Sequence, residues 1–177
     1  MSIRKYRDNT PQYTPSCYID EVATVIGQVT LLEDVSIWPN AILRGDVNYI
    51  QIGQRTNIQD GSILHVCRPT IENPKGYPLI LGEDITVGHN VCLHGCKIHN
   101  RVLIGIGAIL LDGSIIESDI IIGAGTLVPP NKRLKSGYLY LGQPAKAIRP
   151  LNEKEKNFFI ESAQNYVQLK NEYIKGV

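Results

Sequence analysis

The stretch Val87–Val128 reads VGHNVC LHGCK IHNRVL IGIGAI LLDGSI IESDII IGAGTL V, with a break before each recurring aliphatic residue. Val, Leu or Ile returns every six residues, apart from one five-residue step from Leu93 to Ile98. A period of six fits neither an amphipathic helix, which repeats near 3.6 residues, nor a hairpin sheet. The repeat predicts short parallel strands stacked in a solenoid, with the aliphatic residue inward and glycine or a small residue at the corners.

The same pattern continues toward the N-terminus with two interruptions. We expect a slip of two residues around Arg44 to Tyr49. A longer insertion separates Leu64 from Leu81, and if one rung takes six residues the insertion is the Pro- and Gly-containing loop at about 67–77. The expected inward positions are Ile26, Leu32 and Trp38 before the slip, and Ile52, Ile58, Leu64 and Leu81 after it.

This pattern resembles the left-handed parallel β-helix of hexapeptide-repeat proteins. The resemblance implies three rungs in each triangular turn and a left-handed coil, whereas the general chirality of parallel crossovers would favour a right-handed one. Rungs that begin at 64, 81, 87 and 93 then place Leu93 directly above Leu64. We therefore expect a mainly β protein whose coil spans residues 1–150.

A C-terminal helix over residues 151–177 is expected to pack on the coil. Asn152 is suited to cap its N-terminus, with Glu155 completing a capping box. A composition that is 43% hydrophobic and only 7% aromatic suits one narrow aliphatic core in a chain of 177 residues. The apolar stripe of the helix comprises Phe158, Phe159, Ala163, Tyr166, Val167 and Leu169.

Charge and cysteine content narrow the classes of partner and compartment. A net charge of +1, from 18 basic and 17 acidic residues, gives no reason to expect a nucleic acid or an anionic membrane. No apolar stretch approaches the ~20 residues of a membrane span, and Met1 to Asp20 lacks a secretory signal. Four cysteines are too few for a disulfide framework, which favours a reduced, cytoplasmic protein.

Three of the four histidines, His65, His89 and His94, fall within the repeat. Each of His65 and His94 follows an inward leucine by one residue, so they stack in adjacent coils ~4.8 Å apart and can share a metal. His89 belongs to the preceding rung on another side of the prism. A neighbouring chain packed around a threefold axis can supply it, which leaves an open position typical of catalytic zinc. Scattered histidines are the alternative, and His99 is expected at the surface.

Two cysteines, Cys92 and Cys96, flank His94, so a mixed Cys/His metal site is an alternative. Neighbours in a strand point to opposite faces. Cysteine most often behaves as a small buried residue. We therefore favour two core cysteines over two metal ligands.

Further motifs resemble the gamma-class carbonic anhydrase family in order and spacing. They are Leu43-Arg44-Gly45-Asp46, Asn57-Ile58-Gln59-Asp60-Gly61, Leu64-His65, Gly88-His89 and Leu93-His94-Gly95, extended by Leu110-Leu111-Asp112-Gly113 and Leu141-Gly142-Gln143-Pro144-Ala145-Lys146.

The resemblance implies a homotrimer that binds Zn²⁺, or another divalent metal such as Fe²⁺ or Co²⁺, through His65 and His94 of one subunit and His89 of the next. The metal would lower the pKa of a bound water to ~7 and so allow hydration of CO₂ to bicarbonate. Gln59 matches a residue that hydrogen-bonds the reacting group. Rung counting places Gln59 and Asp60 on the side of His89, where both can support the metal ligand.

The resemblance also implies roles for Arg44, Asn57 and Tyr166. Arg44 is expected to pair with Asp46 and with Asp60 across the interface, because its planar fork bridges carboxylates; the alternative is a plain oligomer salt bridge. Asn57 and Tyr166 match polar catalytic positions of the family.

The family's archetype carries a proton-shuttling carboxylate directly after the Arg-Gly-Asp run, where this chain has Val47, and its acidic loop is here reduced to Glu72. Because each turnover must release a proton, we expect metal binding with weak hydration activity.

Two other functions are compatible with the repeat. A hexapeptide-repeat acyltransferase would use one histidine as a general base with acyl-CoA along the coil, but acyl transfer does not require the histidine register or the Arg44, Gln59 and Asp60 set. A non-catalytic, metal-stabilised trimeric scaffold is the third reading. The terminal Gly-Gln-Pro-Ala-Lys run occurs in both enzyme groups and does not discriminate between them.

Overall fold

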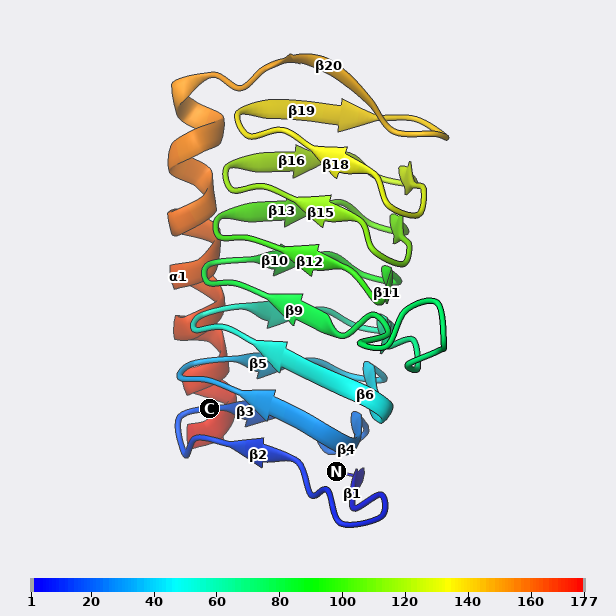
Figure 1. Cartoon of the computed structure of the whole chain (residues 1–177). Coiled ribbons are helices and arrows are strands. Elements are labelled where there is room, and N and C mark those ends of the chain that lie inside the picture. The colour runs from blue at the N-terminus through cyan, green and yellow to red at the C-terminus, as the bar shows by residue number, and fades with distance from the viewer. Residues whose placement is uncertain (1, 177) are drawn as a thin grey trace.

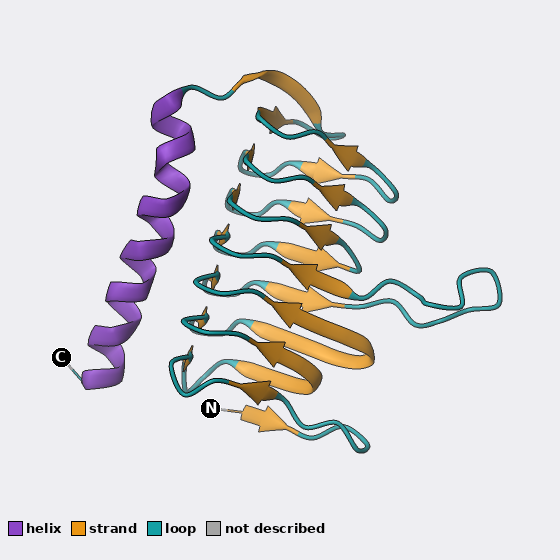
Figure 2. Ribbon diagram, turned by 60° about the vertical axis from the view of Figure 1, so that its left-hand side comes forward, coloured by secondary structure: helices purple, strands orange, loops and turns teal. Residues whose placement is uncertain are grey.

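The computed structural model describes residues 2–176. The chain winds into a column of short parallel strands with one long helix beside it (Figure 1). This is the left-handed parallel β-helix expected from the six-residue repeat. Figure 2 shows the successive coils stacked along one axis, with the helix running along one side of the stack.

The strands form three faces of a prism. Faces 1 and 2 belong to one sheet, because the long strands β4 and β6 bend around the corner between them. The first residues of β6, Ile42–Arg44, pair with β8, and its last, Ile50–Ile52, pair with β9. Face 1 contains β1 (Ser2–Arg4), the first parts of β4 (Thr24–Leu31) and β6 (Ile42–Ile52), β8 (Ile63–His65), β11 (Cys92–His94), β14 (Ile109–Leu110) and β17 (Leu127–Val128).

Face 2 continues the same twelve-stranded sheet past the corner. It contains β2 (Gln12–Tyr13), the last parts of β4 and β6, β9 (Leu79–Leu81), β12 (Lys97–Ile98), β15 (Ile115–Ile116) and β18 (Arg133–Leu134). Face 3 is a separate eight-stranded sheet of β3 (Tyr18–Ile19), β5 (Ser36–Ile37), β7 (Asn57–Ile58), β10 (Thr86–Val87), β13 (Val102–Ile104), β16 (Ile120–Ile122), β19 (Tyr138–Leu141) and β20 (Lys146–Pro150).

Aliphatic side chains at the predicted spacing fill the interior of the coil. From Ile52 onward the expected inward residues are buried, and Leu64 and Leu93 are fully enclosed. The first coils differ from the prediction. Val25, Leu31 and Ile37 point inward, one position before the expected Ile26, Leu32 and Trp38.

The slip between these two regions is three residues rather than two. Val25 to Leu31 takes six residues on β4, while the paired positions Leu43 to Ile52 on β6 take nine. Adjacent apolar residues occur at each early rung, and hydrophobicity alone does not say which of the two points inward. Trp38 is buried outside the coil, where its ring meets Tyr166 and Tyr173 at centroid distances of 5.7 and 5.2 Å.

The insertion leaves the coil after β8 and returns before β9, projecting beside the stack (Figure 1). Backbone hydrogen bonds of 2.9 and 3.0 Å between Cys67 and Tyr77 close its base. The Asn48 amide donates to the carbonyl oxygens of Cys67 and Lys75 at 3.0 and 2.9 Å, and so ties the loop to β6.

Helix α1 (Glu153–Lys175) begins at the predicted cap. The Asn152 side chain accepts from the Glu155 amide and the Glu155 carboxylate accepts from the Asn152 amide, both at 2.9 Å, which confirms the capping box. The helix contacts β3, β5 and β10 of face 3. The Ser162 hydroxyl lies 2.8 Å from the Thr86 hydroxyl and fixes the helix beside the end of β10.

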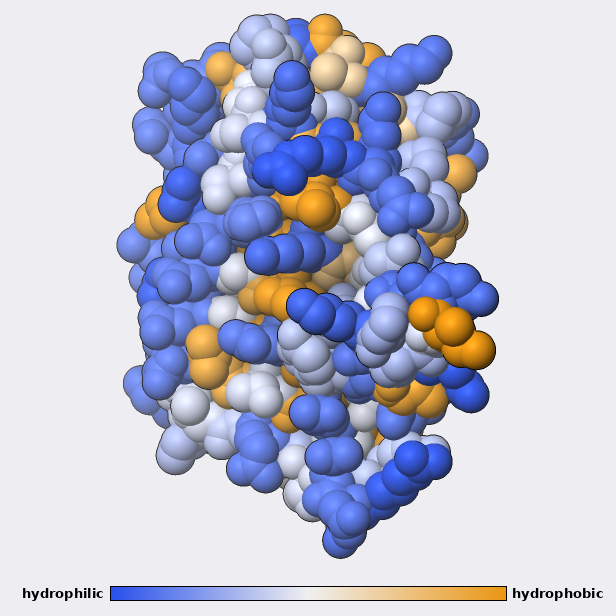
Figure 3. Space-filling model, in the orientation of Figure 1, coloured by the Kyte–Doolittle hydropathy of each residue, from blue (hydrophilic) through white to orange (hydrophobic). Residues whose placement is uncertain are grey.

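Only part of the expected apolar stripe packs inward. Phe159 and Ala163 are buried, whereas Phe158 and Leu169 are 42% and 38% exposed. The side of the molecule in Figure 3 is mainly polar, with a broken apolar strip along its centre. Within residues 2–176, no helix has the length and apolarity required to cross a membrane.

Candidate metal centre

The imidazoles of His65 and His94 lie one above the other at the end of face 1. Strands β8 and β11 pair Leu64 with Leu93 and His65 with His94, which confirms the stacking predicted by rung counting. The ring centroids are 5.1 Å apart. Nδ1 of His65 faces Nε2 of His94 at 3.1 Å, so the coil itself brings two ligand-type nitrogens together.

A carboxylate holds the other nitrogen of each ring. His65 Nε2 lies 3.0 Å from Asp46 Oδ1, and His94 Nδ1 lies 2.7 Å from Asp112 Oδ1. Arg44 pairs with Asp46 within the same chain. Burial would raise the pKa of Asp46, but its hydrogen bonds with His65 and Arg44 outweigh this and lower the pKa. Burial lowers the pKa of His65, although its hydrogen bond with Asp46 opposes this. The lowered pKa favours the neutral imidazole.

The geometry of these groups fits a divalent metal. Tetrahedral zinc with bonds of about 2.0–2.1 Å to nitrogen separates two ligand nitrogens by about 3.3 Å, close to the 3.1 Å between the facing atoms of His65 and His94. In a ligating histidine the N–H of the second ring nitrogen usually donates a hydrogen bond to a carboxylate, which fixes the tautomer and the orientation of the ring. Asp46 and Asp112 are placed for this role.

Asp112 was not among the predicted site residues. It stands one coil above Gly95. The Gly95 amide donates to the His65 carbonyl at 3.0 Å, and the Gly95 carbonyl accepts from the Gly113 amide at 2.8 Å. A Cβ at Gly95 would lie 2.3 Å from Asp112 Oδ1, so glycine gives the carboxylate room to reach His94. Counting three rungs onward from Gly95 would have found this carboxylate.

The second group of predicted residues lies at the other edge of face 1, where β10 ends. Asp60 Oδ2 is 3.0 Å from His89 Nδ1. Strands β7 and β10 pair Ile58 with Val87, which confirms that Gln59 and Asp60 share a side with His89. The side chains of His89 and Asp60 are 45% and 49% exposed.

A run of hydrogen bonds orients Gln59. Its Nε2 donates to Asn57 Oδ1 at 3.1 Å, and Asn57 Nδ2 donates to Thr86 Oγ1 at 3.0 Å. Asn57 is fully buried and Gln59 is 6% exposed. Because the Gln59 amide nitrogen is engaged, its oxygen is the atom left to accept a hydrogen bond.

A cleft of about 250 Å³ adjoins this run between face 3 and the helix. Its polar lining includes Gln59 and Tyr166, and its apolar lining includes Leu103, Ile106 and Phe158. Burial, and then the negative charge of Asp60, raise the pKa of Tyr166, so its phenol remains protonated at neutral pH. The arrangement can hold a small, weakly polar molecule against two hydrogen-bonding groups.

One chain does not bring all the candidate ligands together. Over residues 2–176, no three His, Cys, Asp or Glu side chains form a group suited to a metal ion. The prediction of two core cysteines is confirmed for Cys96, which is buried. It is wrong for Cys92, which lies partly exposed on face 1. His99 is partly exposed. A contact between Arg44 and Asp60 across an interface stays a prediction.

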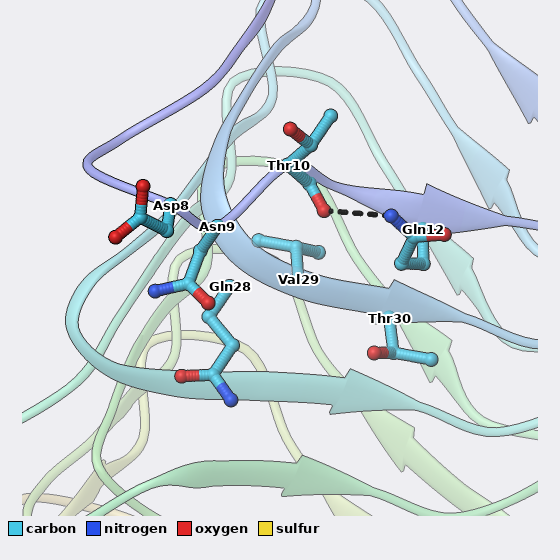
Figure 4. A pocket seen from close by; sticks show the side chains of 7 residues that line it. All are labelled: Asp8, Asn9, Thr10, Gln12, Gln28, Val29 and Thr30. Atoms are coloured by element: carbon cyan, nitrogen blue, oxygen red, sulfur yellow. Dashed lines mark hydrogen bonds between the residues drawn. The ribbon is translucent and has the colours of Figure 1, made fainter.

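A separate polar hollow lies near the N-terminus (Figure 4). It is lined by Asp8, Gln12 and Gln28 among others, and the Gln12 amide donates to the Thr10 carbonyl at 3.1 Å. None of the candidate site residues borders it. This hollow is therefore separate from the histidine-bearing region of face 1.

Comparison with known proteins places this geometry in a family. No protein family model matches the chain. It is 60% identical over 172 residues to Protein YrdA of Escherichia coli (strain K12), covering 97% of this chain and 94% of that protein. It is 41% identical over 175 residues to a carbonic anhydrase of Geobacillus kaustophilus, covering 99% and 92%. It is 40% identical over 162 residues to gamma carbonic anhydrase 2, mitochondrial, of Arabidopsis thaliana, covering 92% and 58%.

The chain belongs to the gamma-class carbonic anhydrase family. Among solved structures, the gamma-class fold seen here is similar to a hexapeptide transferase family protein from Anaplasma phagocytophilum, with a TM-score of 0.90 and 33% identity over 97% of this chain and 98% of that one. Two of these relatives are named carbonic anhydrase and the structural neighbour is named a transferase, so the two names give two alternative activities for the site.

Proposed function

We propose that this protein is a zinc-dependent carbonic anhydrase that hydrates CO₂ reversibly at a site shared between subunits of a homotrimer. The observation that carries the proposal is the facing pair of His65 Nδ1 and His94 Nε2, each backed by a carboxylate. Relatives named carbonic anhydrase at about 40% identity support the same activity. Acyl transfer needs one basic histidine and gives no reason for two stacked ones.

The outward surface of face 1 supports assembly into a trimer. An apolar column runs along it between the two histidine-bearing edges, and Ile42, Ile63 and Ile109 are 39%, 48% and 38% exposed. The strand register places these residues and Cys92 side by side in successive coils. Packing this face against a neighbouring coil would bury the column and bring His89 of one subunit toward His65 and His94 of another.

Each candidate residue has a distinct task in this proposal. Zinc, when bound, supplies the Lewis acidity that lowers the pKa of a water to about 7. His65, His94 and the neighbouring subunit's His89 would hold the metal. The Gln59 oxygen, oriented by Asn57, accepts a hydrogen bond from the attacking group, and the protonated Tyr166 donates to an oxygen of the substrate. The apolar lining of the cleft suits CO₂.

Turnover is expected to be slow for want of a proton carrier. Val47 packs partly buried against the core at the position where a shuttling carboxylate would stand, and Glu72 is exposed on the insertion. The proton released in each hydration must therefore pass directly to buffer.

The four cysteines are free, which agrees with a reducing compartment such as the cytoplasm.

The test joins three measurements on one purified sample: metal content, CO₂ hydration rate and mass in solution. We expect one zinc per subunit, weak but measurable hydration and the mass of a trimer. A metal-free protein that binds acetyl-CoA would instead support a transferase, as the name of the Anaplasma neighbour suggests. Retention of all activity in Gln59→Ala would favour the scaffold reading.

Mixed subunits test whether the site is shared. His65→Ala and His89→Ala trimers should each lack metal. After the two variants are unfolded and refolded together, some interfaces combine an intact His65–His94 pair with an intact His89, so metal and activity should partly return. The double variant His65→Ala/His89→Ala, refolded with itself, is the control. Absence of recovery in the mixture, with trimers formed, would show that the three histidines act within one chain.

A further inference from the structure

A second hollow opens beside the His65 half of the site, on the side away from the cleft. It has a volume of about 260 Å³ and is lined by Tyr6, Arg7, Asp46, Val47 and Arg68. Asp46 links the two features, because it hydrogen-bonds His65 and also borders this hollow. None of the roles assigned above uses Arg7 or Arg68.

Two segments far apart in the sequence each bring one arginine to this place. Arg7 lies in a tight turn in which Tyr6 and Asn9 exchange backbone hydrogen bonds of 3.0 and 3.1 Å. Its guanidinium carbon stands 5.4 Å from the centre of the Tyr6 ring. The turn is packed on the coil, since a Cβ at Gly27 would lie 3.3 Å from Tyr6 Cβ.

Arg68 comes from the start of the insertion. The residue before it, Cys67, is fixed by both backbone hydrogen bonds with Tyr77 and by the Asn48 amide. A Cβ at Gly76 would lie 2.6 Å from the Arg68 carbonyl carbon, so the two strands of the loop base are in close contact. The backbone that carries each arginine is therefore anchored, although the side chains themselves are exposed.

The charge of the hollow is unbalanced. Within residues 2–176, neither Arg7 nor Arg68 forms an ion pair with a carboxylate. Asp46 is already engaged by Arg44 and His65. At the next position Val47 offers an uncharged wall, where a carboxylate would repel an anion. Two guanidinium groups without a carboxylate partner, beside the uncharged side chain of Val47, present the planar donor forks that carboxylates accept.

We propose that this hollow binds a small carboxylate-type oxyanion, held by Arg7 and Arg68 next to the metal centre. The volume lies below the range of about 300–1,000 Å³ typical of sites for drug-sized ligands, so the occupant has few atoms. Two sources share this chemistry: bicarbonate, and the carboxylate of a small organic acid. Anion binding itself follows from the fold and its charges, while a role for the anion beside the reaction rests on the proposed function.

In the test, anions are titrated into metal-free and zinc-loaded samples of the trimer at fixed pH and ionic strength, and binding is measured by calorimetry. The probes are bicarbonate, acetate and benzoate. Arg7→Gln/Arg68→Gln is compared with Lys5→Gln/Lys75→Gln, which removes two cations from the same two segments outside the hollow. Each exposed arginine should contribute roughly two- to fivefold in affinity, so the double arginine variant should bind roughly 4- to 25-fold more weakly.

The outcomes separate the sources and the hypotheses. Metal-independent bicarbonate binding that exceeds acetate and benzoate binding would identify the reaction's own anion, and the reverse order would identify an organic acid. Equal affinity in the two double variants, or binding only when zinc is present, would overturn the proposal. Metal content and hydration rate measured on the same samples show independently whether the proposed anhydrase function holds.

Discussion

The two edges of face 1 carry the two parts of the site in different states of readiness. At one edge His65 and His94 already face each other, with side chains 18% and 32% exposed and a carboxylate behind each ring. At the other edge His89 stands alone with Asp60, both nearly half exposed. Strand register within one chain completes the first part, whereas the second part has its supporting groups but lacks a partner imidazole.

This difference shows which step of folding prepares each half. The His65–His94 pair requires only that β8 and β11 adopt their register, which the buried leucines beside them enforce. In the proposed trimer, the His89 half contributes to the metal site only after subunits associate. Metal binding should therefore stabilise the assembly as well as the subunit, because a ligand that binds one state preferentially shifts the equilibrium toward it.

The largest expected effect comes from breaking the paired half. His94→Ala removes one of two prearranged nitrogens and should lower zinc affinity and hydration by at least about 100-fold, since even outer partners of ligands are worth 10- to 100-fold. His99→Ala is the matched control, because His99 lies outside both histidine groups. Zinc affinity and rate are measured on both variants. Retained zinc in His94→Ala would contradict the comparison.

A smaller effect should follow from removing a carboxylate from behind a ligand. Asp112→Ala should lower zinc affinity by about 10- to 100-fold, because the His94 ring loses its hydrogen bond of 2.7 Å. Competition with a chelator measures this affinity without depending on turnover. Asp60→Ala tests the equivalent position of the other half, where greater exposure predicts a smaller loss. Equal losses would show that the two halves are supported alike.

Val47→Glu should sharpen the comparison on the side of turnover. A carboxylate beside Asp46 can carry the proton away from the His65 half, so hydration in weak buffer should rise by roughly tenfold, below the range for a fully positioned acid or base. Val47→Gln, which cannot carry a proton, is the control. The gain should disappear in concentrated buffer. An equal gain in both variants would assign the effect to shape.

The smallest effect is expected at the helix that covers the His89 half. Asn152→Ala removes the cap of α1 and should lower the free energy of unfolding by about 1 kcal/mol, measured by urea denaturation. Zinc content should remain that of the unmodified protein, since the paired half is on another face. The cleft should loosen, because Ser162 and Tyr166 lie on this helix. A fall in zinc content would link the halves more closely than proposed.

Repeat spacing predicted the coil. Together with the three rungs per turn that the resemblance implies, it also predicted the His65–His94 stack and the neighbourhood of His89, because register in a solenoid follows from the number of residues in each rung. It failed in the first coils, where Leu31-Leu32 and Ile37-Trp38 offer two apolar residues for one inward position. Rung counting from Gly95 gives the position of Asp112, but its contact with His94 depends on the space that Gly95 leaves, which the repeat does not show. No rung count could reveal which ring nitrogens face each other.

The insertion between β8 and β9 determines where the sequence of this coil can change in length. It adds chain length between His65 and His94 without adding a rung, so residues can be gained or lost there while the two imidazoles keep their vertical spacing. The same loop carries Arg68 and closes on itself through Cys67 and Tyr77. The length and the residues of this loop can therefore vary while the positions of the metal ligands stay the same.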